Sequence, residues 1–488
     1  MSLDHSRAPV LEAVDAYHRR GVLSFSPPGH KQGLGVDPAV RLLLGESVFQ
    51  HDLLATGGLD DRRTRGGYLE EAEQLMADAV HADHTFFTTC GSSLSVKAAM
   101  LAVAGPEQQL LIGRDAHKSV VAALILSGIE PVWVEPRWDE ERHLAHPPSA
   151  QEYADAFAAH PGARGAVVTS PTPYGSSADL RGIAEVCHGR GRPLIVDEAW
   201  GAHLPFHSDL PTWAMDAGAD VCVTSIHKMG SGLEQGSVFH LQGDLVKAEV
   251  LKNRADLLGT TSPSVLIYAA LDGWRRQMAL NGHALISHAL KTAGELRAGI
   301  EEIEGLHVND ARDFCGPGLA DGFDPLPVVV DLSARDVSGY RVADWLRERR
   351  SISVHLADHR RINVQITHAD GAATTRPLLE ALRAVVRAAA DWDEEPQVAV
   401  PSAAGLRMEQ ACLPRDAFFA ATEDVPLSAA PGRVAAEMVT PYPPGIPAIL
   451  PGERLTEPVL AYLRTGVKAG MHLPDAADPE FRTVRVVK

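Results

Sequence analysis

The sequence has few cysteines and arranges them in no recognisable pattern. Their number is odd, they are scattered, and no two form a CxxC pair. This distribution argues against a disulfide framework or a zinc site and is typical of reduced thiols. We therefore expect a cytoplasmic protein without a metal site. The cysteines are Cys90, Cys187, Cys222, Cys315 and Cys412.

Long apolar runs and basic stripes are also missing. The longest apolar runs, such as 98–104 and 120–126, are far shorter than the roughly 20 residues that cross a bilayer. Residues 1–20 lack the layout of a signal peptide and predict an amphipathic helix. With a formal charge of −18 there is no basic stripe to neutralise phosphates. We therefore expect neither a membrane nor a nucleic acid as a partner.

The length of 488 residues predicts several domains, because one ordinary core does not grow this large. The pattern changes near residue 290, where a helix (288–304) leads into shorter strands. A stretch rich in charge, proline and alanine (393–404) then reads as a linker. The domains we expect are an N-terminal segment (1–55), a major domain (56–290), a small α/β domain (291–393), with strands near 327–332, 352–356 and 362–367, and a C-terminal domain (405–488).

Between about residues 85 and 240 the sequence repeats a short apolar run, a polar tip and a helical segment. Apolar residues run continuously instead of alternating with polar ones, which is typical of strands buried on both faces. The segments 94–104, 120–127 and 180–188 are long enough for helical crossovers. A doubly wound α/β domain with a mainly parallel sheet is therefore predicted. Its expected strands are 85–89, 109–112, 166–169, 194–196 and 221–224.

Each predicted strand is followed by polar residues suited to binding a ligand. The carboxyl ends of parallel strands share one edge of a sheet, where open α/β sheets bind their ligands. Five such tips on one edge indicate a functional site and not five unrelated turns. The tips read CGSS (90–93), GRDAHKS (113–119), SPTPYG (170–175), DEAWGAH (197–203) and SIHKMGSG (225–232).

Lys228, in the last tip, directly follows a buried strand and precedes a glycine-rich turn, which is unusual for a lysine. Asp197 ends another strand, and GSS (91–93) opens a helix. Pyridoxal phosphate (PLP) requires an amine for a Schiff base, a carboxylate beside the pyridine nitrogen, and N–H and hydroxyl donors for its phosphate. We therefore predict a PLP enzyme whose Schiff-base lysine is Lys228, with Ser225 and His227 assisting at the phosphate.

Two further side chains are placed to cover the faces of the predicted ring. The imidazole of His117 can stack on one face of a pyridine ring, and the methyl group of Ala199 can pack on the other. Trp200 is interpreted as a wall of the site and not as core packing. With these side chains, four of the five tips contribute to the predicted site.

Several segments form a specific combination, above all PGHK, S-x-H-K and PYPPGIP. They are FSPPGHKQG (25–33), GLDD (58–61), HADHTFFTTCGSS (81–93), RDAHKS (114–119), SPTPYG (170–175), VDEAWGAH (196–203), TSIHK (224–228), TTSPS (260–264) and TPYPPGIPAILPGE (440–453). On these motifs the sequence resembles the Orn/Lys/Arg decarboxylases, PLP enzymes of fold type I, in the shorter form that lacks an N-terminal wing domain. The likeness runs almost from end to end.

This resemblance implies an aspartate-aminotransferase-like α/β major domain that binds PLP, a small α/β domain and a C-terminal α+β domain. It puts the Schiff base on Lys228, the pyridinium partner at Asp197 and the stacking imidazole at His117. It also implies a homodimer or larger homo-oligomer with shared active sites. The other cofactor contacts that it implies are Gly91, Ser92, Ser93, Ala199, Ser225 and His227, with Thr261 or Ser262 reaching in from a second subunit.

The implied reaction is α-decarboxylation of a basic amino acid, with arginine or lysine ahead of ornithine, to agmatine or a diamine plus CO2. A proton must return to Cα, and Lys228 and His227 are the candidate donors. One alternative is an aminotransferase, whose substrate carboxylate Arg360 or Arg361 could bind. The other is a catalytically silent homologue, against which the intact cofactor motifs argue.

The distal cation of a basic substrate needs a carboxylate that is held in place. Glu453 follows the proline-rich segment 441–453, whose fixed path would present its carboxylate rigidly, so it is the first candidate. Asp60 and Asp61 are the next candidates. Three positions depart from the family's usual pattern and leave the identity of the substrate open: Val96, Trp200 and His368.

Overall fold

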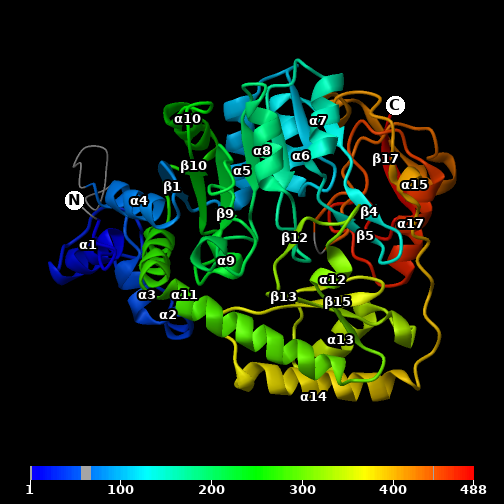
Figure 1. Ribbon diagram of the computed structural model, residues 1–488. Helices are drawn as coiled ribbons and strands as arrows, with labels where there is room; N and C mark the ends of the chain where they lie inside the picture. The colour runs from blue at the N-terminus through cyan, green and yellow to red at the C-terminus, as the bar shows by residue number, and fades with distance from the viewer. Residues whose placement is uncertain (1–2, 56–66, 443–444) are drawn as a thin grey trace. The chain divides into compact units, whose positions relative to one another are not determined.

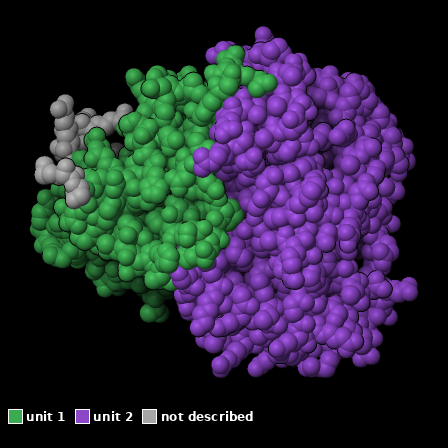
Figure 2. Space-filling model, in the orientation of Figure 1, with its two compact units in different colours: residues 1–103, 188–285 green, residues 104–187, 286–488 purple. Residues whose placement is uncertain are grey.

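The computed structural model describes residues 3–55, 67–442 and 445–488. The chain forms two compact units, coloured separately in Figure 2. Within the described residues, no helix combines the length and apolar character that a membrane span requires. The predicted domain boundaries are not tested by this division and stay predictions. Unit 1 comprises Met1–Val103 and His188–Leu285, and unit 2 comprises Ala104–Cys187 and Ile286–Lys488.

The strands of unit 1 pair in the order β1-β10-β9-β8. β9 (Val221–Ser225) is parallel to β8 (Leu194–Asp197) and antiparallel to β10 (Ser237–Leu241), which is antiparallel to β1 (His84–Thr88). β1, β9 and β8 therefore run in the same direction, and their carboxyl ends share one edge. Every residue of β8, β9 and β10 is buried, as the continuous apolar runs predict.

The predicted N-terminal amphipathic helix is present as α1 (Pro9–Arg19), which buries Val10 and Val14. The long helix α11 (Val265–Glu301) carries a buried ion pair between Asp272 and Arg275. The Asp272 carboxylate also accepts the Val10 N–H at 2.9 Å and so holds the start of α1. Figure 1 shows α11 as a continuous rod, so the predicted helix 288–304 is the second half of a longer one. The other helices of unit 1 are α2 (Pro38–Leu44), α3 (Glu46–His51), α4 (Tyr68–Ala79), α5 (Gly91–Val103), α9 (Ile226–Met229) and α10 (Ala248–Leu258).

Unit 2 contains a parallel set of strands in the order β6-β2-β3. They are β6 (Ala166–Thr169), β2 (Gln109–Gly113) and β3 (Glu130–Val134), of which the sequence predicted the first two. α6 (Lys118–Ser127) follows β2 and is buried on most of its surface, which suits a crossover helix that packs on a sheet. The crossover helices of this part also include α7 (Ala150–Ala159) and α8 (Leu180–His188).

A second sheet of unit 2, in the order β11-β13-β15-β14, is antiparallel throughout. Its strands β13 (Pro327–Asp331) and β15 (Arg361–Gln365) confirm two of the predicted strands. The third prediction, 352–356, was wrong for most of its length, because β14 (Leu356–Ala357) begins only at its last residue. The remaining elements here are β11 (His307–Asn309), α12 (Ala311–Phe314), β12 (Gly322–Phe323), α13 (Gly339–Arg350) and α14 (Ala372–Ala389), with β4 (Arg137–Asp139), β5 (Leu144–His146) and β7 (Ser176–Ser177) earlier in the chain.

The C-terminal part of unit 2 has its own apolar core around the antiparallel pair β16 (Thr422–Pro426) and β17 (Thr483–Val487). α17 (Glu457–Lys468) places Val459, Leu460 and Leu463 in that core. The chain has no regular structure between α14 and α15 (Ala403–Leu406), as expected of a linker. α16 (Pro414–Phe419) completes the elements of this part. All five cysteines are free, so no disulfide supports this fold.

Candidate active site

Lys228 lies in the short helix α9, which begins where the buried strand β9 ends. The chain turns tightly after it: a Cβ on Gly230 would lie 2.7 Å from the Ile226 carbonyl oxygen and 2.8 Å from the Trp274 ring. Burial lowers the pKa of the Lys228 amine from 10.5 to about 8, although Asp197 acts in the opposite direction. The amine is therefore neutral far more often than that of an exposed lysine, as a nucleophile requires.

Asp197 is the last residue of β8 and is only 4% exposed. Its Oδ1 accepts a hydrogen bond from the Ala199 N–H at 3.3 Å. Burial raises the pKa of the carboxyl, while the Lys228 amine and the Ala199 N–H lower it. A buried carboxylate is stabilised by a cationic partner, and a protonated pyridine nitrogen is such a partner.

Trp200 covers the amine of Lys228. The Nζ atom lies 3.9 Å from the centroid of the indole ring, within the range of a cation–π contact. Ala199, one residue earlier, is buried beside Asp197. The contact supports the interpretation of Trp200 as a wall of the site.

The GSS tip begins α5, a helix of 13 residues whose first N–H groups suit an anion. Gly91 has a φ of +73°, its N–H donates to the Gln235 carbonyl oxygen, and no atom lies within 4 Å of where a Cβ would stand. The hydroxyl of Ser225, at the end of β9, donates to that of Ser92 at 2.7 Å. Ser93 is exposed. Open space above a helix N-terminus, flanked by two hydroxyls, fits the phosphate of PLP.

His227 precedes Lys228 and is half-buried. Its Nδ1 lies 3.1 Å from the Gly236 carbonyl oxygen, which can only accept, so Nδ1 carries a proton. Its Nε2 lies 4.0 Å from the Glu234 carboxylate. Thr261 and Ser262, in the loop between α10 and α11, are both exposed. An exposed position is what a contact with a second subunit would require.

His117 belongs to unit 2 and caps α6. Its Nδ1 accepts the Ser119 N–H at 3.2 Å, so the proton of the neutral ring lies on Nε2. The C-terminal segment packs on the imidazole: a Cβ on Gly445, whose φ is +92°, would lie 3.2 Å from Cδ2 and Nε2 of His117. The Lys118 N–H also donates to the Gly445 carbonyl oxygen at 3.0 Å. The proline-rich segment therefore helps to hold the His117 tip.

Glu453 is not presented in the way that the sequence suggested. It is 2% exposed, and its carboxylate pairs with Arg114 of unit 2 at 3.0 Å and accepts the Leu450 N–H at 2.8 Å. Arg114 also donates to the Pro447 carbonyl oxygen. A carboxylate that is already paired with a cation is poorly suited to bind another, so these contacts support a structural role and give the predicted substrate contact no support.

The structure thus gathers most of the predicted cofactor residues within unit 1. Lys228, Asp197, Ala199 and Trp200 lie together, and Ser92 meets Ser225. Asp60 and Asp61 lie outside the described residues. Val96, one of the departures from the family pattern, is fully buried in α5 and is a core residue.

Sequence reasoning missed Glu198, which follows Asp197 and is fully buried. The signal was present in the sequence. Successive residues of a strand point to opposite faces, so two acids in a row at the end of a buried strand cannot both face a ligand. One of them had to enter the core.

A model of the major domain of the Orn/Lys/Arg decarboxylases matches residues 8–314, and a model of their C-terminal domain matches residues 401–478. The arginine decarboxylase of Halalkalibacterium halodurans is 37% identical over 99% of this chain and 98% of its own length. The arginine decarboxylase of Bacillus subtilis is 35% identical over 100% and 99%.

Solved structures show the same fold. Lysine decarboxylase A from Pseudomonas aeruginosa has a TM-score of 0.82 at 24% identity, covering 98% of this chain and 80% of that one. The alanine–glyoxylate aminotransferase from Nostoc sp. has a TM-score of 0.52 at 17% identity, covering 79% and 94%. These matches confirm the predicted α/β fold class. The two domain models and the full-length relatives establish more: the chain belongs to the Orn/Lys/Arg decarboxylase family.

Proposed function

We propose that this chain is a PLP-dependent decarboxylase that converts arginine to agmatine and CO2, with Lys228 as the residue that binds the cofactor covalently. The observation that carries the proposal is the arrangement at the edge shared by β8 and β9. There a lysine amine with a pKa of about 8 lies beside a buried carboxylate and under an indole ring. The relatives named as arginine decarboxylases, 35–37% identical over nearly the whole chain, support arginine over lysine and ornithine.

The residues of unit 1 would hold PLP by its two ends. Lys228 and Asp197 would bind the aldehyde and the pyridine nitrogen, and the α5 N-terminus with Ser92 and Ser225 would bind the phosphate. When bound, the cofactor supplies an electron sink for the bond that breaks at Cα.

Two side chains of the chain can then return a proton to Cα. Lys228 has a pKa close to neutral, so it can hold or release a proton near physiological pH. His227 is the second candidate, and its Nε2 lies 4.0 Å from the Glu234 carboxylate. Trp200 would keep water from one side of the Lys228 amine.

The contacts of Arg360 and Arg361 weaken the aminotransferase alternative. Arg361 is 1% exposed and its Nε pairs with the Asp358 carboxylate at 3.0 Å. Arg360 donates to the Glu141 carbonyl oxygen at 2.6 Å. Each guanidinium already has an acceptor within the protein, and a decarboxylase gains by leaving the substrate carboxylate without a cation.

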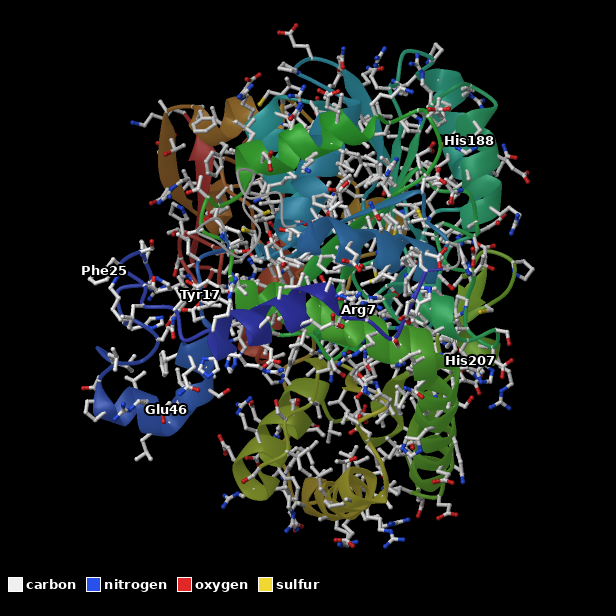
Figure 3. All side chains as sticks on the ribbon, turned by 90° about the vertical axis from the view of Figure 1, so that its left-hand side faces the viewer. Arg7, Tyr17, Phe25, Glu46, His188 and His207 are labelled. Atoms are coloured by element: carbon white, nitrogen blue, oxygen red, sulfur yellow. The ribbon has the colours of Figure 1, made fainter. Side chains whose placement is uncertain are left out.

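We also propose that the chain works as a homodimer. Between residues 23 and 48, eight large apolar side chains are 38% to 95% exposed, which amounts to on the order of 1,000 Å² and matches the roughly 800 Å² per partner of a standard interface. Figure 3 shows Phe25 at the outer edge of this segment. The segment is electrically balanced, Lys31 and Arg41 against Asp37 and Glu46, so two copies of an acidic chain can meet there without repulsion.

The same interface would reach the predicted shared contacts. Leu54, just after the apolar segment, pairs with Ser264 of the TTSPS loop. A second copy bound on the segment would therefore lie next to Thr261 and Ser262, as a shared phosphate site requires.

A product assay tests the proposed reaction. The purified chain with PLP is given equal amounts of arginine, lysine and ornithine, and the amines and keto acids are measured by mass spectrometry, with Lys228→Ala as the control. We expect agmatine in excess of the two diamines and none from the variant. A keto acid as the main product would favour the aminotransferase. An excess of cadaverine or putrescine would mean that lysine or ornithine, and not arginine, is the preferred substrate.

A further inference from the structure

Glu198 ties the ends of β8 and β9 together. Its N–H donates to the Val223 carbonyl oxygen of β9 at 2.9 Å, and its own carbonyl oxygen accepts the Gly201 N–H at 2.8 Å. Its Oε2 accepts from the Ala214 N–H and from the Cys222 thiol, each at 3.3 Å. The residue that follows Asp197 is therefore bound on both its backbone and its side chain.

The surroundings of the Glu198 carboxyl disfavour its charged form. The side chain is 0% exposed, and Oε1 has no hydrogen-bond partner among the described residues. Burial raises its pKa well above the ordinary value, and the nearby charges of Asp216 and Asp197 act in the same direction. A neutral acid can still accept both hydrogen bonds on Oε2 while its proton stays on Oε1.

The turn from Asp197 to Gly201 closes over this side chain. A Cβ on Gly201 would lie 2.4 Å from the Glu198 Cγ and 2.9 Å from Leu204, so any larger residue there would displace the Glu198 side chain. The turn carries Ala199 and Trp200, and the Trp200 ring covers the Lys228 amine at 3.9 Å. The position of that ring therefore depends on what lies beneath the turn.

We propose that Glu198 is a positioning residue, whose buried side chain holds the 197–201 turn through its hydrogen bonds, so that Trp200 and Asp197 set the environment of the Lys228 amine. Its importance for catalysis rests on the proposed function, but its effect on Lys228 does not. The role requires an acceptor of the right length at position 198 and no negative charge. A glutamine meets that requirement, and an alanine or a methionine does not.

The readout is the pKa of Lys228 in the full-length chain without cofactor. Acetylation is followed across a pH series by mass spectrometry of the Lys228 peptide, together with the thermal midpoint of each variant. Asp220→Ala is the matched control: this carboxylate is buried too, at 4% exposed, and accepts the Leu194 N–H at 2.8 Å, at the opposite ends of the same two strands. This variant tests whether the loss of any buried carboxyl at the ends of these strands is enough to change the pKa of Lys228.

In Glu198→Ala we expect the pKa of Lys228 to rise from about 8 toward 10.5, because water reaches the amine when the turn loosens. Glu198→Met, which keeps the volume but not the acceptor, should do the same if the alanine variant does not fold. Glu198→Gln should keep the wild-type value. Asp220→Ala should lower the thermal midpoint without moving the pKa of Lys228.

Two results would overturn the proposal. An unchanged pKa of Lys228 in both Glu198→Ala and Glu198→Met would reduce Glu198 to a stabilising core residue. A shift in Glu198→Gln as large as that in Glu198→Ala would mean that the acid itself is required. Since neither PLP nor arginine enters this experiment, its outcome is independent of whether the chain decarboxylates arginine.

Discussion

At the scale of single residues, the charge state of Lys228 links the site to stability. Its folded-state pKa lies below its ordinary value, so between about pH 8 and 10.5 the unfolded chain binds more protons than the folded one. The free energy of unfolding of the cofactor-free chain should therefore rise with pH across this window. Lys228→Met should remove the rise and stabilise the chain at pH 7 by on the order of 1–2 kcal/mol, since the side chain is half-buried and partly screened.

Denaturant titrations of both proteins at pH 7, 8, 9 and 10 test this expectation. The curves of wild type and Lys228→Met should converge as pH rises above 10. Parallel curves would mean that Lys228 has an ordinary pKa in the folded chain.

A second prediction at this scale concerns the charge of Asp197. Asp197→Asn removes the charge that raises the pKa of Lys228, so that pKa should fall below about 8 in the cofactor-free chain. Turnover of the PLP-loaded enzyme should drop by at least ~100-fold, since an electrostatic contact of this kind contributes roughly 3 kcal/mol or more. Asp220→Asn is the control, because Asp220 lies at the other end of the strands. A variant with near-normal turnover would remove Asp197 from the proposed role.

At the scale of elements, the Glu453–Arg114 pair joins the C-terminal segment to the tip that follows β2. Glu453→Gln leaves the partly buried Arg114 guanidinium without its anion and should cost about 1–3 kcal/mol of stability. The KM for arginine should change little. Glu409→Gln is the matched control, since its pair with Arg454 is exposed and such pairs contribute about 0–1 kcal/mol. A strong rise in the KM for arginine at unchanged stability would mean that Glu453 binds the substrate after all.

Most of the parallel strands were predictable because burial on both faces leaves a continuous apolar run, as in 166–169 and 221–224, although β3 was missed. β10 was missed, since the short run SVFHL contains His240 and follows a glycine-rich loop. Its antiparallel direction depends on pairing with β1 and β9, which no local pattern records. The lysine and carboxylate were predictable from the tips of these strands, whereas the partner of Glu453 lies 339 residues away and could not be read from its neighbours.

At the scale of the whole molecule, the exposed apolar segment between residues 23 and 48 leads to a prediction about assembly. Leu42 and Leu43 are 88% and 83% exposed on α2, a helix that buries none of its residues. Replacing both with glutamate should convert the dimer to monomer in sedimentation velocity and weaken PLP binding, because each site would lose Thr261 and Ser262 of the second copy. The paired change Leu245→Glu and Leu280→Glu, also at exposed leucines of unit 1, should leave the dimer intact. A wild-type chain that sediments as a fully active monomer would contradict the proposal.

The central claim is that Lys228 carries the cofactor, and reductive labelling tests it most directly. The chain is loaded with PLP, treated with borohydride, digested, and mapped by mass spectrometry. The account predicts a phosphopyridoxyl group on the peptide that contains Lys228, and on no other lysine at equal PLP and protein concentrations. A label on a different lysine, or no label at all, would contradict it.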